Sequence, residues 1–273
     1  MKKEIMARLE ELRNIIRAQK SLAVAFSGGI DSSLIAKVAF EQLGERALAI
    51  TVDSPILPRR ELRLAQQRAR EIGISHIVVQ HSELENPEFV KNPENRCYYC
   101  KKESEKIVLK AARSRGFHSI AFGVNATDHT EHRPGLKAMR ESESLLPLEE
   151  AGIGKDIIPL LARKAGLSDP GQPSTTCLAS RIPYGDPIDA QKLRRVEKSE
   201  DFLYHLGIRI CRVRLHGDIA RIEVESGDLE TILTHRLDII QHFRKLGFSY
   251  ITADLEGYRS GSMDESLKKG LLS

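Results

Sequence analysis

The sequence has no tryptophan, 5% aromatic residues and a net charge of only +4. Nucleic-acid binding calls for a clustered basic face with stacking aromatics, so this composition argues against an RNA or DNA partner. No apolar run approaches the roughly 20 residues that a membrane-spanning helix needs. Residues 1–20 have the charged, amphipathic pattern of a helix and lack the apolar core of a secretory signal. We therefore expect a soluble, cytoplasmic protein with no membrane partner.

Cysteine is also scarce, with four in 273 residues. In a cytoplasmic chain, cysteines indicate metal binding or catalysis before disulfides. Cys97 and Cys100 form a C-x-x-C pair just ahead of a helix predicted at 101–115, where both thiolates can reach one metal, although redox pairs share this spacing. Cys177 lies in a proline-rich loop that we expect to fold back over the same site. Three thiolates suit a [4Fe–4S] cluster with one open iron, and the alternatives are zinc or three unrelated buried cysteines.

The stretch Ser27-Gly28-Gly29-Ile30-Asp31-Ser32-Ser33 joins a predicted buried strand to a predicted helix. Two glycines let the backbone approach an anion, and the helix N-terminus adds the positive end of its dipole. The three serine hydroxyls can donate hydrogen bonds, and Asp31 can hold a Mg²⁺ that bridges phosphate oxygens. The loop lacks the lysine of the G-x-x-x-x-G-K-[ST] motif, which excludes the usual P-loop kinases and GTPases.

What remains of this stretch resembles the PP-loop of the ATP pyrophosphatases. The resemblance implies that ATP is bound and split between its α and β phosphates, so that a substrate is adenylated. The alternative interpretation is a Gly-Gly turn followed by a serine-capped helix.

Strands and helices alternate through the first two thirds of the chain. Strands are predicted at 22–26, 47–52, 76–80 and 119–125, with helices at 32–43, 59–72, 101–115 and 154–165. This alternation predicts an α/β fold, in which a parallel sheet carries helices on both faces. Ligands bind such sheets at the carboxyl ends of the strands, where Ser27, Asp53 and Asn125 fall. We expect these three residues to share one site.

A second, smaller α+β domain is predicted beyond the proline-rich segment 168–185. Helices at 187–206 and 228–246 and strands at 209–215, 220–225 and 249–253 are expected to form it. The predicted domains are residues 1–186 and 187–273.

The segment Cys211-Arg212-Val213-Arg214-Leu215 reads as a strand. Its period of two places the arginines on one face and Cys211 on the core face. Arg212 and Arg214 can form an anion site, and a solvated edge face is the alternative. Glu200 and Glu223 are tentative Mg²⁺ ligands, but such carboxylates are usually just solvated.

Five stretches together look like the LarE family of ATP-dependent sulfur transferases, namely 27–33, 95–101, 133–138, 173–185 and 211–218. The resemblance implies adenylation of a carboxylate of pyridinium-3,5-biscarboxylic acid mononucleotide, followed by replacement of AMP with sulfur, in synthesis of the nickel-pincer nucleotide. It implies ATP and Mg²⁺ as cofactors. We also expect a homo-oligomer. The resemblance assigns nucleotide binding to the loop residues with Asp53, Gly123, Asn125 and Asp128, and substrate binding to Ser180, Arg181, Arg212 and Arg214.

The sulfur source separates two kinds of family member. With a single cysteine at the site, the residue matching Cys177 gives up its own sulfur and becomes dehydroalanine. The additional Cys97 and Cys100 resemble three-cysteine members, in which a [4Fe–4S] cluster takes extra sulfide on its open iron, supplied as sulfide or by a sulfur donor. The chain departs from the family pattern at Thr127 and His132, where Asp and Tyr are expected.

Two other functions fit parts of the pattern. A PP-loop tRNA thiolase can also use three cysteines and a cluster, but the modest charge and few aromatics disfavour it. A nucleotide sensor or cluster carrier would bind ATP without releasing pyrophosphate.

Overall fold

The computed structural model describes residues 2–130, 134–141, 144–167, 176–259 and 261–262. The chain divides into two compact units, one of Met1–Glu83 with Asn95–Thr175 and one of Leu84–Glu94 with Thr176–Ser273. The sequence placed this division after residue 186. The segment from Thr176 instead belongs with the second unit, because Arg181 forms a buried ion pair with Glu200 on the helix that follows.

The short segment 84–94 also belongs to the second unit. The side-chain amide of Asn92 donates to the carbonyls of Pro183 (2.7 Å) and Asp186 (2.9 Å). Asn92 is fully buried and has a positive φ of 56°, a conformation that asparagine tolerates better than most residues.

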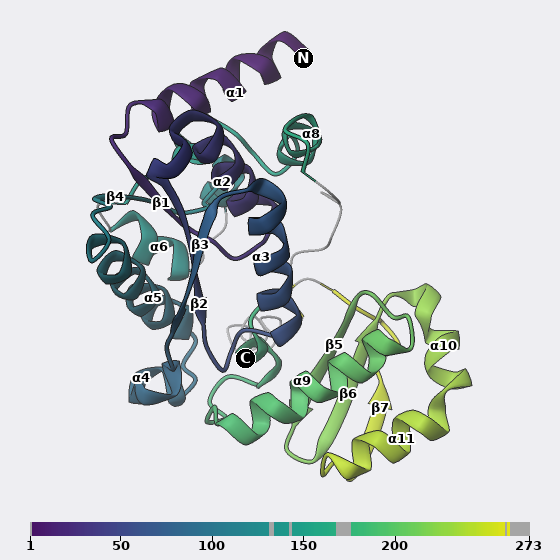
Figure 1. Cartoon of the computed structure of the whole chain (residues 1–273). Coiled ribbons are helices and arrows are strands. Elements are labelled where there is room, and N and C mark those ends of the chain that lie inside the picture. The colour runs from purple at the N-terminus through teal and green to yellow at the C-terminus, as the bar shows by residue number, and fades with distance from the viewer. Residues whose placement is uncertain (1, 131–133, 142–143, 168–175, 260, 263–273) are drawn as a thin grey trace. The chain divides into compact units, whose positions relative to one another are not determined.

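The sheet of the first unit has the order β3 (Ser75–Gln80), β2 (Ala47–Asp53), β1 (Leu22–Ala25) and β4 (Ser119–Ala121), and all its pairs are parallel (Figure 1). The predicted α/β fold is confirmed. β4 ends earlier than predicted because Phe122 N donates to Leu145 O (3.0 Å), and the chain then leaves the sheet before Asn125.

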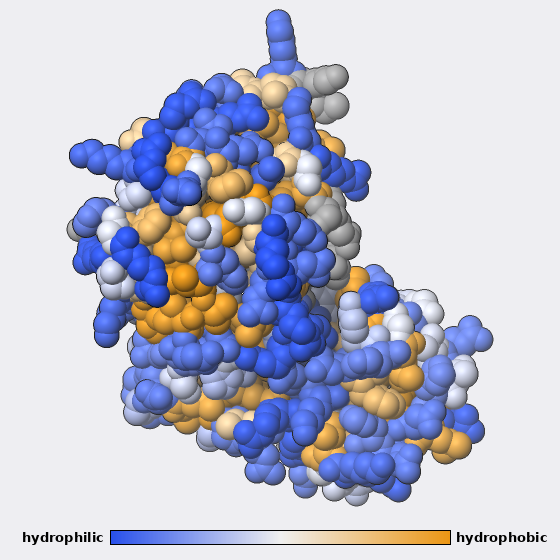
Figure 2. Space-filling model, viewed as in Figure 1, coloured by the Kyte–Doolittle hydropathy of each residue, from blue (hydrophilic) through white to orange (hydrophobic). Residues whose placement is uncertain are grey.

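Helices cover both faces of this sheet. Apolar residues of one face form a core with α1 (Lys2–Arg17), α2 (Ile30–Leu43), α3 (Arg59–Ile72), α7 (Pro147–Glu150) and α8 (Ile158–Lys164). The other face packs against α5 (Arg96–Arg113) and α6 (Pro134–Arg140). β3 is an edge strand with half-buried residues, and Figure 2 shows hydrophobic residues gathered on the molecule around β2, β3 and α5.

Helix α5 starts at Arg96 and not near Lys101, so Cys97 and Cys100 lie inside its first turns and not ahead of it. Packing against α6 accounts for the extra turn, since a Cβ at Gly135 would lie 3.6 Å from the Cβ of Cys97. The Tyr98 hydroxyl also donates to Glu141 (2.8 Å), just beyond α6.

The second unit is built on a small mixed sheet. β5 (Cys211–His216) runs antiparallel to β6 (Ile219–Val224), which pairs in parallel with β7 (Tyr250–Ala253). Its helices are α4 (Pro87–Val90), α9 (Ala190–His205), α10 (Leu229–Thr234) and α11 (Arg236–Lys245). The single helix predicted at 228–246 is interrupted at His235, whose ψ of 16° is not helical. The described helices include none with the length and apolar character needed to cross a bilayer.

Candidate active site

The loop after β1 is closely packed against helix α3. Gly28 has a φ of 74°, and a Cβ at this position would lie 2.7 Å from the Cα of Ala65. The Gly28 carbonyl accepts a hydrogen bond from Arg68, a buried residue of α3. Only glycine fits here, because both the backbone conformation and the neighbouring helix exclude a side chain.

The loop hydroxyls organise the start of α2. Ser32 Oγ donates to the Gly29 carbonyl (3.1 Å), and Ser27 Oγ accepts from the Gly29 N–H (3.2 Å). Ser33 Oγ is buried and has no hydrogen-bond partner among the described residues. Gly29 occupies the N-cap position without a side-chain cap, so the alternative of a serine-capped helix is wrong. An uncapped helix start beside a glycine turn suits an anion.

Asp31, Asn125 and Asp128 converge at this loop. Asn125 Nδ2 donates to Asp31 Oδ2 (2.9 Å), and the Asn125 N–H donates to Asp128 Oδ2 (3.1 Å). Gly123 allows the close approach, since a Cβ there would lie 3.2 Å from the Ser32 nitrogen. Burial raises the pKa of Asp31, and the hydrogen bond from Asn125 opposes this rise. Asp31 is therefore a half-buried carboxylate whose charged form would be stabilised by a cation bound beside it.

Sequence reasoning missed Lys155, which supplies a positive charge at this point. The side-chain Nζ of Lys155 lies 2.9 Å from Asp128 Oδ1, and its backbone N–H donates to Thr127 Oγ1 (3.1 Å). The only local signal is a lysine between Gly154 and the next helix. Thr127, which departs from the family pattern, also donates to Asn125 Oδ1 (2.6 Å), whereas His132 lies outside the described residues.

Asp53 is the last residue of β2 and lies at the same edge of the sheet. Its carboxylate accepts hydrogen bonds from Arg59 and from Gln80 Nε2 (2.8 Å). The structure thus brings Asn125 to the loop through Asp31, but it turns Asp53 toward an arginine at the start of α3.

In the second unit, Arg181 ends the short 3₁₀ turn Leu178–Arg181 that follows Cys177. Its side chain is 0% exposed, and its Nε and Nη2 donate to the two oxygens of Glu200 at 2.8 and 3.0 Å. Burial alone lowers the pKa of Arg181, but the Glu200 carboxylate outweighs burial and the pKa is raised. The guanidinium therefore stays charged inside the protein.

Arg214 forms a second buried pair on the sheet. Its Nε and Nη2 donate to Glu223 Oε2 at 3.0 and 2.8 Å. Glu200 and Glu223, tentative Mg²⁺ ligands in the sequence analysis, are thus both engaged by guanidinium groups, and Glu223 also accepts from Arg221 (2.9 Å).

Arg212 lies beside these pairs, 5% exposed, with its guanidinium 5.1 Å from the ring centre of Tyr258. Burial, with the nearby charge of Arg181, lowers the pKa of Arg212. Arg214 is equally buried, so the alternative of a solvated arginine face is wrong. Arg181, Arg212 and Arg214 are thus three buried guanidinium groups in one unit, and the planar guanidinium group is well suited to binding phosphate.

The cysteines are divided between the units. Cys97 and Cys100 lie one turn apart on α5, exposed and partly exposed, whereas Cys177 belongs to the second unit. Cys211 is buried, which confirms its predicted place in the core. In the described ranges no three His, Cys, Asp or Glu side chains gather as a metal site. The three-cysteine cluster stays a prediction.

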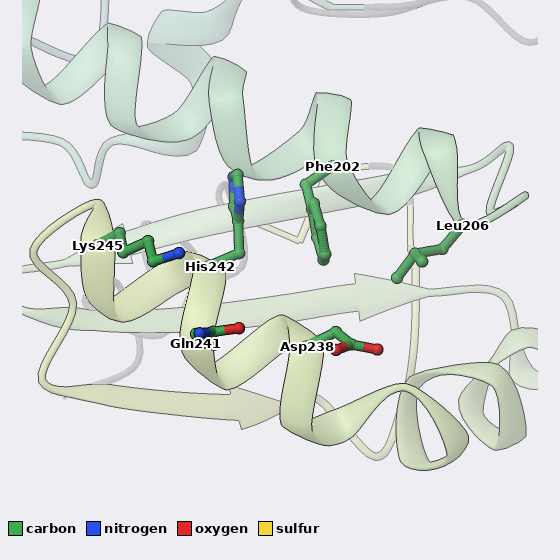
Figure 3. Close-up of a pocket in the computed structure, with 6 residues that line it drawn as sticks. All are labelled: Phe202, Leu206, Asp238, Gln241, His242 and Lys245. Atoms are coloured by element: carbon green, nitrogen blue, oxygen red, sulfur yellow. The ribbon is translucent and has the colours of Figure 1, made fainter.

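A separate pocket of about 370 Å³ lies between α9 and α11 (Figure 3). Phe202 stacks on His242 with ring centres 4.2 Å apart, and burial lowers the pKa of His242. None of the predicted site residues lines this pocket, whose other walls are Leu206, Asp238, Gln241 and Lys245.

The loop at the end of β1 in a parallel sheet defines an ATP-using enzyme of the PP-loop class, and the asparagine synthase family matches residues 10–94. The chain is 32% identical over 273 residues to the pyridinium-3,5-bisthiocarboxylic acid mononucleotide synthase of Lactiplantibacillus plantarum, covering 100% of this chain and 96% of the relative. This chain belongs to the LarE family of PP-loop sulfur transferases.

Two further proteins are similar to this chain. An uncharacterized protein of Synechocystis sp. is 40% identical over 96% of this chain and 99% of its own length. A glutamine-hydrolyzing GMP synthase of Aspergillus oryzae is 28% identical over 59% of this chain and 35% of its own length. The similarity to the GMP synthase thus covers only part of each chain.

Proposed function

We propose that this enzyme adenylates a carboxylate of pyridinium-3,5-biscarboxylic acid mononucleotide with ATP, releases pyrophosphate and replaces AMP with sulfur. The product would be the thiocarboxylate used in nickel-pincer nucleotide synthesis. The proposal rests on the glycine loop before α2, where the helix N-terminus has no side-chain cap and the Asp31 carboxylate lies in the first turn. The named activity of the Lactiplantibacillus relative supports the choice of substrate.

The chemistry requires activation because a carboxylate is a poor electrophile. An acyl-adenylate supplies AMP as a leaving group, and loop N–H groups stabilise the departing pyrophosphate. Asp31 would hold Mg²⁺, which neutralises phosphate charge when bound. The donor set fits, since the Asp31 carboxylate lies close enough to Asp128 for the two charges to interact, and carboxylate oxygens are the ligands that Mg²⁺ takes in proteins.

The substrate carries a phosphate of its own, which we assign to Arg212 and Arg214 with Ser180 beside them. The burial of both guanidinium groups on one strand of the second unit supports this assignment, because a guanidinium group fits the geometry of phosphate. Fixing the phosphate would hold the carboxylate in place for attack on ATP, so the contribution is positional and not covalent.

For the sulfur, we propose that Cys97, Cys100 and Cys177 hold a [4Fe–4S] cluster. Thiolates are the ligands such clusters use, and Cys97 and Cys100 share one side of α5. When bound, the cluster would supply sulfur through its open iron, replenished by sulfide or a donor, so that the protein keeps its cysteines.

Product analysis tests the proposal. With ATP and the pyridinium substrate we expect pyrophosphate and AMP, and ADP as the main product would contradict PP-loop chemistry. Mass spectrometry after turnover with excess sulfide distinguishes the sulfur sources. An unchanged chain with repeated product formation supports the cluster, whereas a chain lighter by the mass of H₂S indicates dehydroalanine at Cys177.

A further inference from the structure

We infer that Arg181 is a positioning residue, which fixes the turn that presents Cys177 and does not itself bind substrate. The inference rests on the proposed role of Cys177 in sulfur transfer. The family resemblance places Arg181 among the substrate-binding residues, but its side chain is 0% exposed.

The first observation is where the guanidinium points. Arg181 Nη1 lies within hydrogen-bond distance of the Cys177 carbonyl (2.9 Å) and of the Thr176 carbonyl (2.8 Å). The same nitrogen reaches the hydroxyls of Thr176 (2.7 Å) and Ser180 (2.9 Å). One nitrogen thus contacts both sides of the turn around Cys177.

The second observation is what holds the guanidinium. Its other two nitrogens bind both oxygens of Glu200, which is 1% exposed. Glu200 Oε1 also accepts from the Val213 N–H (3.0 Å) in the middle of β5. A continuous series of hydrogen bonds therefore runs from the sheet backbone through Glu200 and Arg181 to Cys177.

A second buried pair acts on the same turn. Arg214 Nη1 donates to the Ser180 carbonyl (2.9 Å) while its other nitrogens are bound to Glu223. The Cys177 residue itself is only partly buried. The backbone of the turn is fixed from inside the protein, while the residue that carries the sulfur stays accessible. Positioning of this kind matters because small displacements of a reacting group have large effects on rate.

The test separates positioning from plain stability by measuring two steps. Arg181→Lys keeps a positive charge against Glu200 but loses the planar fork that reaches the turn. We expect sulfur transfer to fall about tenfold or more, while ATP–pyrophosphate exchange stays within about twofold of the wild-type rate. Arg195→Lys is the matched control, because Arg195 bonds to the Gly247 carbonyl (2.8 Å) in the same unit, away from Cys177.

A double-mutant cycle tests the route through Glu200. Glu200→Gln should slow sulfur transfer in the wild-type background but add little in the Arg181→Lys background, since Glu200 acts through Arg181. Wild-type sulfur transfer by Arg181→Lys, with Cys177→Ser inactive, would overturn the inference. Equal losses of exchange, transfer and thermal stability in the Arg181→Lys and Glu200→Gln variants would also overturn the inference, because they would indicate that the ion pair is purely structural. An active Cys177→Ser variant, or wild-type protein without exchange, would instead overturn the proposed function.

Discussion

At the residue scale, Gly28 shows how one position can combine two constraints. Gly28 and Gly116 both have positive φ values, 74° and 80°, but of these two only Gly28 has backbone atoms of another helix within reach of an added Cβ. Gly116→Ala should therefore cost only the strain of its conformation, about 1–3 kcal/mol. Gly28→Ala should lower the free energy of unfolding in urea by more than this and should abolish pyrophosphate exchange. Equal effects of the two substitutions would contradict the assigned contact with Ala65.

Arg212 provides a binding test. Arg212→Ala should weaken binding of the pyridinium mononucleotide by about 1.5–3 kcal/mol, the value of a charged hydrogen bond, with little change for ATP. Isothermal titration of both ligands measures this. Arg209→Ala serves as the control, because Arg209 stacks on Tyr204 at the surface of the same unit. Equal losses for both ligands would mean that Arg212 does not recognise the substrate phosphate.

At the element scale, α5 provides a test of the cluster. Cys97 lies in the first turn of this helix, whereas Cys211 is buried in β5. In protein purified without oxygen, Cys97→Ser should lose iron and Cys211→Ser should keep it, as measured by iron and sulfide analysis. Iron retained by the Cys97 variant, or lost equally by both, would count against the proposed ligands.

Element boundaries could be predicted where the sequence carries a local signal, and not where distant packing sets them. The limits of α3 were predicted to the residue, because Gly73 ends the helix in a left-handed conformation. α5 begins earlier than predicted, since packing against α6 lies outside any local pattern. The break at His235 likewise has no glycine or proline to mark it.

The site residues divide in the same way. The loop and its neighbours at the strand ends could be predicted from motif and topology, and the structure joins Asp31 to Asn125. The partners of the arginines could not, because pairing of Arg181 with Glu200 depends on how a turn packs against a helix. Lys155 was missed for the same reason.

At the scale of the whole molecule, Glu83 makes stability depend on pH. Glu83 is 2% exposed, and burial raises its pKa above the ordinary 4.5. A raised pKa means that its contribution to stability is complete below the unfolded-state value and is lost as pH rises through the folded-state value. The free energy of unfolding in urea should therefore be higher for Glu83→Gln than for the wild type, and this difference should be larger at about pH 7 than at about pH 4.5. A difference that does not vary with pH would contradict this burial effect.

The segment around Asn92 affects when the second unit can finish folding during synthesis. Its amide and backbone pair with Pro183, Gly185 and Asp186, which are translated much later. As the chain leaves the ribosome, the first unit must be completed around a segment whose partners do not yet exist. The second unit can therefore reach its final hydrogen bonding only after the first has been translated. A clone that starts at residue 176 would encode a sheet and helices without the peptide that completes them.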